Sequence, residues 1–222
     1  MSLTQGLISG GWLWAAALFS LLMLLLALRS APWPVLAGER RLQHLLFGAT
    51  VSLMLMWTMR AGVSPGLGIH FLGMTTLALM FGWDLAILSG TLALLGMTVI
   101  GHESWDTFSV NVLCSVIVPA LASIGVLRLV EAKLPRNFFV YLFMCAFFGA
   151  GVATAAAGMV MALLLWFDGV YPWGKIYLEY VRFLPLIMFP EGLLNGIIMT
   201  AMMAFHPDWI RTFDARLYID EQ

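Results

Sequence analysis

The chain has 222 residues, of which 62% are hydrophobic and only 10% charged, and its mean hydropathy is +0.94. This composition excludes an ordinary soluble protein and predicts an integral membrane protein. The net charge of -1 and the scattered cations exclude a nucleic-acid-binding surface. Because each spanning helix takes roughly 20 residues, we expect one integral membrane domain over residues 1–222.

Hydrophobic runs predict an all-α bundle of about seven transmembrane helices. The expected spans are 10–29, 43–63, 69–81, 84–101, 108–130, 137–167 and 178–205. The third run is too short to cross about 30 Å of hydrocarbon upright. The stretch 69–101 therefore forms either a tight helical hairpin around Gly82-Trp83-Asp84 or a single broken helix. The first run lacks a basic leader and a cleavage motif, so we expect it to be retained.

The distribution of arginine and lysine favours seven spans with the N-terminus outside and the C-terminus inside. The inner side then holds Arg29, Arg40, Arg41, Arg128, Lys133, Arg136, Arg211 and Arg216, and the outer side holds Arg60, Lys175 and Arg182. This excess satisfies the positive-inside rule. We expect a multi-pass protein of the cell (inner) membrane. With six spans the bias would nearly vanish.

Two outer segments carry candidate metal ligands. The segment Gly68-Ile69-His70-Phe71-Leu72-Gly73-Met74 places a histidine at the mouth of the short third run. If that run is helical, Met74 lies one turn from His70, and a thioether suits a soft metal such as copper. The loop containing His102, Glu103 and Asp106 is acidic and would attract cations, although an ordinary solvated turn is the alternative.

Within the last span, Glu191 follows Pro190, and Asn195 lies one turn further on the same helix face. A carboxylate at membrane depth needs a partner. Two interpretations stay open: Glu191 and Asn195 line a substrate path, or Glu191 pins two helices together by pairing with Arg60 or a hydroxyl.

No enzyme motif is present. The chain lacks the phosphate-binding loop Gly-x-x-x-x-Gly-Lys-[Ser/Thr], the zinc motif His-Glu-x-x-His and the elbow Gly-x-Ser-x-Gly. Cys114 and Cys145 lie in apolar runs without the spacing of a metal or redox site, so we interpret them as core residues. We expect no catalytic residues and no organic cofactor, and any uphill transport must draw its energy from another subunit.

The stretch from Gly66 to Pro119, with Gly-x-Gly-Ile-His-Phe-Leu-Gly, the Gly82 turn and Asn111, resembles the membrane substrate-binding component of cobalt and nickel energy-coupling-factor transporters, the CbiM/NikM type. The Glu191 and Asn195 segment matches in position as well. The resemblance implies a seven-helix uptake component in the lipid bilayer, working with a transmembrane coupling protein and ATPase subunits. It implies that nickel or cobalt is bound near the outer face by the extreme N-terminus, here Met1, and by His70.

The chain departs from this family at its N-terminus. Members typically begin Met-His-Ile and continue with Asp-Gly-Phe-Leu, whereas Ser2 replaces the histidine and Gln5 the acidic residue, before Gly6 and Leu7. Serine cannot replace an imidazole donor for nickel. We expect a transition-metal ion near His70, with His102 or Met74 as further ligands. The alternative is a membrane accessory or assembly protein with the same fold and no metal site.

Overall fold

Helices form most of the molecule, as the apolar runs predict. The computed structural model describes residues 2–3, 7–64, 67–214 and 218. Its helices are α1 (Gly10–Ser30), α2 (Trp33–Gly38), α3 (Arg40–Thr58), α4 (Met74–Val99), α5 (Phe108–Val112), α6 (Val118–Lys133), α7 (Phe138–Val140), α8 (Gly149–Phe167), α9 (Trp173–Glu179) and α10 (Leu184–Phe205). Stretches of π-helix at Leu113–Ile117 and Tyr141–Phe148 join α5 to α6 and α7 to α8.

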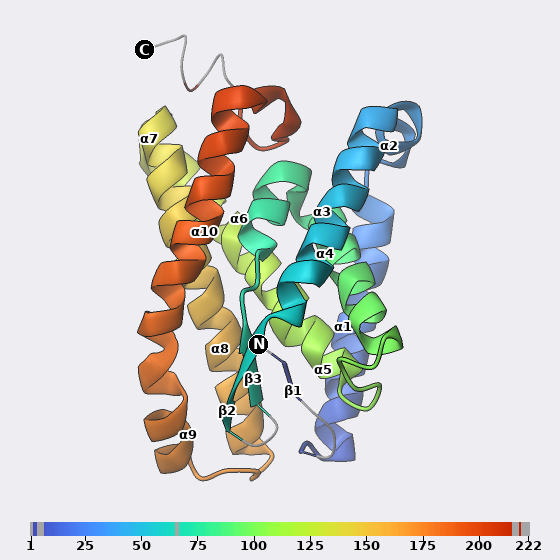
Figure 1. Ribbon diagram of the computed structural model, residues 1–222, viewed down its shortest axis with the longest axis vertical. Helices are drawn as coiled ribbons and strands as arrows, with labels where there is room; N and C mark the ends of the chain where they lie inside the picture. Colours follow the sequence, from blue (N-terminus) through green and yellow to red (C-terminus); the bar gives the residue numbers. More distant parts are fainter. Residues whose placement is uncertain (1, 4–6, 65–66, 215–217, 219–222) are drawn as a thin grey trace.

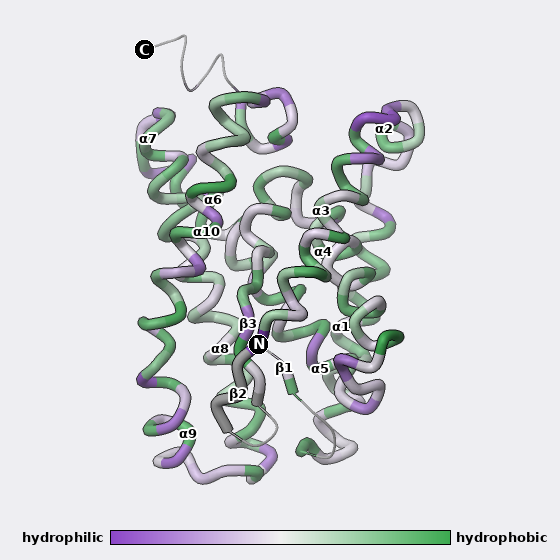
Figure 2. Tube along the Cα trace, in the orientation of Figure 1, coloured by the Kyte–Doolittle hydropathy of each residue, from purple (hydrophilic) through white to green (hydrophobic). Residues whose placement is uncertain are grey.

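Among the described residues, five helical segments are long and apolar enough, by length and composition alone, to cross a membrane. They are Gly10–Ser30, Met74–Val99, Phe108–Lys133, Phe138–Phe167 and Trp173–Phe205. Figure 2 shows hydrophobic residues along the helical shafts and many hydrophilic ones at helix ends and connections. Large side chains such as Trp14, Leu18 and Leu186 are exposed, as expected for surfaces that face lipid. The predicted class, an all-helical polytopic membrane bundle, is confirmed; seven spans and the N-out orientation stay predictions.

Helix α4 lies at the centre of the bundle and packs against α1, α3 and α6 (Figure 1). Two hydrogen bonds between hydroxyl groups join α4 to its neighbours. The Thr50 hydroxyl of α3 lies 2.7 Å from the Ser89 hydroxyl, and the Thr75 hydroxyl lies 2.8 Å from the Ser123 hydroxyl of α6. A buried hydroxyl in an apolar bundle needs such a partner, so these pairs fix how α4 packs against the flanking helices.

The two halves of α4 fold back on each other at Gly82. This glycine has φ 85° and ψ 166°, which no helix allows. A Cβ added at Gly90 would lie 2.9 Å from the Met74 sulfur, although these residues would be about 24 Å apart in a straight helix. Of the two structures expected for 69–101, the helical hairpin is therefore the correct one.

The chain after α10 closes this hairpin. Arg211 Nη1 donates to Phe81 O at 2.9 Å and to Asp84 Oδ1 at 2.8 Å, and its backbone N–H donates to Met80 O at 2.8 Å. The carbonyl groups that the break at Gly82 leaves without helical partners are thus satisfied by a segment more than one hundred residues away in sequence.

A small antiparallel sheet interrupts the helical fold, which corrects two of the expected spans. Its strands are β1 (Ser2–Leu3), β2 (Arg60–Ser64) and β3 (Leu67–His70), in the order β1-β3-β2. The expected helix over 43–63 therefore ends at Thr58, and the one expected from residue 69 begins only at Met74. Figure 1 shows the strands at mid-width, between α8 and α5.

Candidate functional site

His70 is the last residue of β3 and lies in a largely buried position. Its side chain is buried, and its ring is 5.2 Å from the Trp57 ring. Nδ1 donates to the Phe71 carbonyl at 2.9 Å. Burial lowers the pKa of His70 well below its usual value. The imidazole is therefore neutral, and with the proton on Nδ1 the lone pair is on Nε2, which is the form that binds metals.

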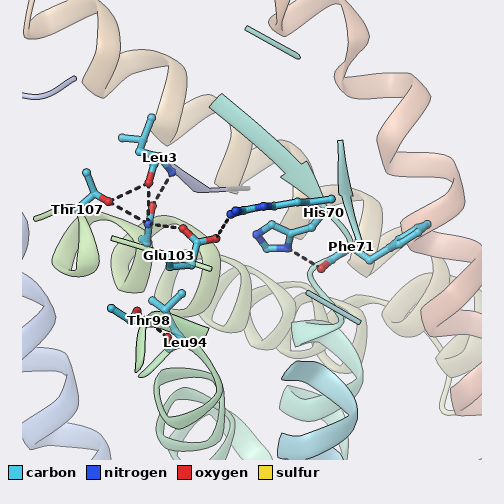
Figure 3. A network of polar contacts seen from close by, with 9 residues as sticks. Leu3, His70, Phe71, Leu94, Thr98, Glu103 and Thr107 are labelled. Atoms are coloured by element: carbon cyan, nitrogen blue, oxygen red, sulfur yellow. Dashed lines mark hydrogen bonds and ion pairs between the residues drawn. The ribbon is translucent and has the colours of Figure 1, made fainter. Parts of the chain in front are cut away.

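The N-terminal strand lies beside β3 and is held there by α5. In the sheet Ser2 pairs with Gly68, and Ser2 is buried. The Leu3 N–H donates to Asn111 Oδ1 at 2.8 Å, while Asn111 Nδ2 donates back to Leu3 O at 3.1 Å. The Thr107 hydroxyl also donates to Leu3 O at 2.8 Å, as Figure 3 shows. Asn111 therefore acts as a clamp that brings the first residues next to the His70 strand.

We expect Asn111→Ala to release β1. Loss of the two bonds to Leu3 costs about 2 kcal/mol of unfolding free energy, and β1 should exchange its amide hydrogens much faster. Hydrogen–deuterium exchange of the N-terminal peptide measures this. Asn137→Ala, which removes the side-chain cap at the start of α7, is the control and should leave β1 protected. Unchanged protection of β1 in Asn111→Ala would refute the clamp.

An ion pair faces the same strands. Arg60 is the residue opposite His70 in the β2–β3 ladder, and its Nη1 lies 3.0 Å from Glu103 Oε1. Glu103 has a side chain only 4% exposed and accepts a bond from Asn111 Nδ2 at 3.3 Å on its other oxygen. One network thus connects His70, Arg60, Glu103, Asn111 and the N-terminal strand.

The other predicted metal ligands are Met1, His102 and Met74, and the structure does not bring the described ones to His70. Met1 lies outside the described residues. His102 is exposed in the loop after α4, and its N–H donates to Met97 O. Met74 is fully buried among apolar side chains and is not one helical turn from His70, because the chain between them is not helical. Within the described ranges, no three histidine, cysteine or acidic residues are grouped to hold a metal ion.

Glu191 and Asn195 cap the start of α4. Glu191 Oε2 accepts the Leu72 N–H at 2.8 Å and Oε1 the Gly73 N–H at 2.7 Å, while Asn195 Oδ1 accepts the N–H and hydroxyl of Thr76 at 2.9 and 2.7 Å. Asn195 Nδ2 also donates to Glu191 Oε1. The expected partner, Arg60 or a hydroxyl, is wrong: Glu191 joins α10 to α4 through backbone N–H groups, which a helix start leaves without partners.

A cavity of about 440 Å³ lies between the strands and α10. Its lining includes Arg60 and His70 from the strands, Phe71 just after β3 and Pro190 from α10, and the other lining residues are apolar. The cavity therefore reaches both the candidate ligand and its ladder partner.

Glu103 was expected as one of three candidate ligands in its loop, but without Arg60 as its partner. Arg60 was considered only as a partner of Glu191, and Thr107 was not noticed. The one sequence signal was an isolated arginine, Arg60, near the outer end of the expected span 43–63. No local pattern shows that this arginine meets an acidic residue 43 positions later.

Comparison with known proteins places this geometry in context. The sequence profile of the family CbiM, described as cobalt uptake substrate-specific transmembrane region, matches residues 3–209. The fold is similar to the crystal structure of a truncated transition metal transporter, with a TM-score of 0.79 and 16% identity over 93% of this chain and 100% of that one. A second transition metal transporter structure matches with TM-score 0.79 and 16% identity over 92% of this chain and 93% of that one. No curated protein matches the sequence.

Proposed function

The chain belongs to the CbiM family of cobalt-uptake substrate-specific transmembrane components, and from this premise we propose that it binds a transition-metal ion at His70 and presents it for uptake. The ion is the transported substrate and not a resident cofactor. The proposed ions are cobalt and nickel, with copper as a further candidate, since imidazole nitrogen suits all three.

One observation supports this proposal above the others: β1 is clamped by Asn111 beside β3, the strand that ends in His70. The arrangement brings the first residues of the chain, with their backbone nitrogens, to the strand that carries a neutral imidazole. Nitrogen donors of these two kinds are the donors that nickel and cobalt prefer. The proposed ligands are His70 and Met1, with His102 as a third candidate.

Uptake against a gradient needs energy that no motif in this sequence supplies. We therefore propose that the chain works beside a transmembrane coupling protein and ATPase subunits, and that this assembly lies in the inner cell membrane. Glu191 and Asn195, both buried, support the helical hairpin that begins beside His70 and do not contact the proposed ion.

Elemental analysis of detergent-purified protein tests the proposal. The protein is exposed to nickel, cobalt, copper and zinc in turn and then freed of loosely bound metal. We expect about one ion per chain, bound most tightly for nickel or cobalt, and lost in His70→Ala.

His44→Ala removes an exposed imidazole from α3 and serves as the matched control; it should keep the metal. His102→Ala shows whether the second histidine contributes. Absence of a specific metal from the wild-type protein would contradict the proposal and favour the non-transporting accessory protein, in which Ser2 marks a lost site.

A further inference from the structure

The residue opposite His70 in the sheet is itself a cation. Arg60 and His70 are paired in the β2–β3 ladder, and residues directly opposite each other in an antiparallel pair have Cβ atoms about 5 Å apart. The positive charge at Arg60 therefore lies close to any ion bound by His70. A divalent ion there would be repelled while the arginine keeps its position.

Glu103 holds that arginine in place. Its Oε1 lies 3.0 Å from Arg60 Nη1, and its side chain is 4% exposed whereas that of Arg60 is 30% exposed. Of the two partners the carboxylate is therefore fixed in the protein, with Asn111 Nδ2 on its second oxygen at 3.3 Å. The arginine lines the open hollow beside α10 and is the more exposed partner of the pair.

Among the described residues, a further polar group, the Ser2 hydroxyl, lies near the Arg60–Glu103 pair. The Ser2 hydroxyl is buried and has no hydrogen-bond partner among the described residues. A Cβ added at Gly68 would lie 3.4 Å from Ser2 Oγ and 4.0 Å from Arg60 Cδ, so the serine oxygen and the arginine stem border the same glycine. A buried hydroxyl without a partner is costly and is often found where a ligand or water supplies the missing bond. Figure 3 shows Glu103 and His70 entering this region from different elements.

We propose, resting on the metal site proposed above, that Glu103 is a ligand of the incoming ion and that Arg60 is a tethered cation which occupies its place until the ion arrives. When metal binds at His70, the Arg60 guanidinium leaves Glu103 Oε1 and turns toward the surface, to which 30% of its side chain is already exposed. The carboxylate then exchanges one cation for another, so no proton is lost from the pair. The buried Glu103 carboxylate thus supplies a metal ligand in this chain, where the Ser2 side chain cannot replace an imidazole.

Substitutions at the two partners should act in opposite directions. Arg60→Met removes the competing cation and should tighten metal binding by about tenfold or more, because it ends both the repulsion and the need to break the pair. Arg60→Lys keeps the positive charge, so its affinity for the metal should stay close to that of the wild type. Glu103→Gln keeps the shape but loses the anionic donor, and should weaken binding by about tenfold to a hundredfold. Isothermal titration with cobalt or nickel ions measures all three.

Matched controls change the same charges elsewhere. Arg182→Met removes a cation from the segment before α10, and Asp106→Asn removes an exposed carboxylate from the loop that holds Glu103; neither should alter affinity. Because Arg60→Met leaves Glu103 buried without its partner, its melting temperature without metal should fall, and metal should raise it by more than in the wild type. The rise in melting temperature on adding metal can be measured even for a variant of low stability.

The outcomes separate this inference from the function on which it rests. Metal bound by the wild type, lost in His70→Ala and unaffected by Arg60→Met and Glu103→Gln would overturn the role of the pair alone. Metal bound by the wild type, more tightly by Arg60→Met and less tightly by Glu103→Gln, would support it, and any other pattern in which the wild type binds metal would overturn the role of the pair. Absence of metal from every variant would overturn both proposals.

Discussion

Replacing Glu191 with leucine is expected to lower the free energy of unfolding by about 4 kcal/mol. The variant loses the acceptor for two backbone N–H groups, those of Leu72 and Gly73, which lie at 2.8 and 2.7 Å from the carboxylate. Glu191 is 1% exposed, so water cannot replace the lost bonds, and a helix start has no internal partner to offer. The N-terminal half of the α4 hairpin should loosen first.

Thermal denaturation in detergent measures this effect. Glu191→Gln keeps one carbonyl oxygen and should lose about half as much stability. Glu179→Leu, which replaces a half-exposed carboxylate on α9, is the control and should change stability by less than about 1 kcal/mol. If Glu191→Gln kept full stability and lost only metal uptake, Glu191 would belong to a substrate path and the capping role would be refuted.

Gly82→Val should destabilise the protein by about 3 kcal/mol or more. At φ 85° and ψ 166° the backbone of Gly82 lies in a region open almost only to glycine. An added Cβ would also come within 2.7 Å of Arg211 Nη1 and 3.1 Å of Asp84 Oδ1. The side chain of Asp84 is 1% exposed, so displacing Arg211 would leave a buried carboxylate without its cation.

The shift in melting temperature on Gly82→Val gives the size of this effect. Gly125→Ala is the matched control, because a Cβ at this helical glycine of α6 meets nothing within 4 Å; it should be neutral or slightly stabilising. Equal melting temperatures for Gly82→Val and the wild type would mean that the hairpin turn tolerates side chains and does not depend on the Arg211 bonds.

Much of the bundle could be predicted from composition and hydrophobic runs, since lipid permits little besides helices along an apolar stretch. The hairpin at Gly82 was one of the two structures expected for residues 69–101. The strands were missed because each is only two to five residues long. Such short segments do not show a recognisable alternation of apolar and polar residues. The turn signal Ser64-Pro65-Gly66, just before Gly68, was available and points to a hairpin of strands.

The site was only partly predictable for a different reason. His70 and Asn111 belong to recognisable segments, so both could be named as candidates from the sequence. Their partners depend on contacts between distant parts of the chain: Glu191 meets Gly73 across 118 positions, and Arg60 meets Glu103 across 43. Sequence reasoning correctly expected a partner for Glu191 but could not distinguish a side chain from the free N–H groups at a helix start, which any sequence provides.

Anomalous diffraction from crystals grown with cobalt ions would test the central claim most directly. A metal site at His70 predicts one strong peak at the cobalt absorption edge, about 2.1 Å from His70 Nε2 as for other imidazole–metal bonds, next to the Asn111-clamped N-terminal strand. Absence of a peak at saturating cobalt, or a peak only at His44, His206 or another surface residue, would contradict the account and leave the fold without the metal site proposed for it.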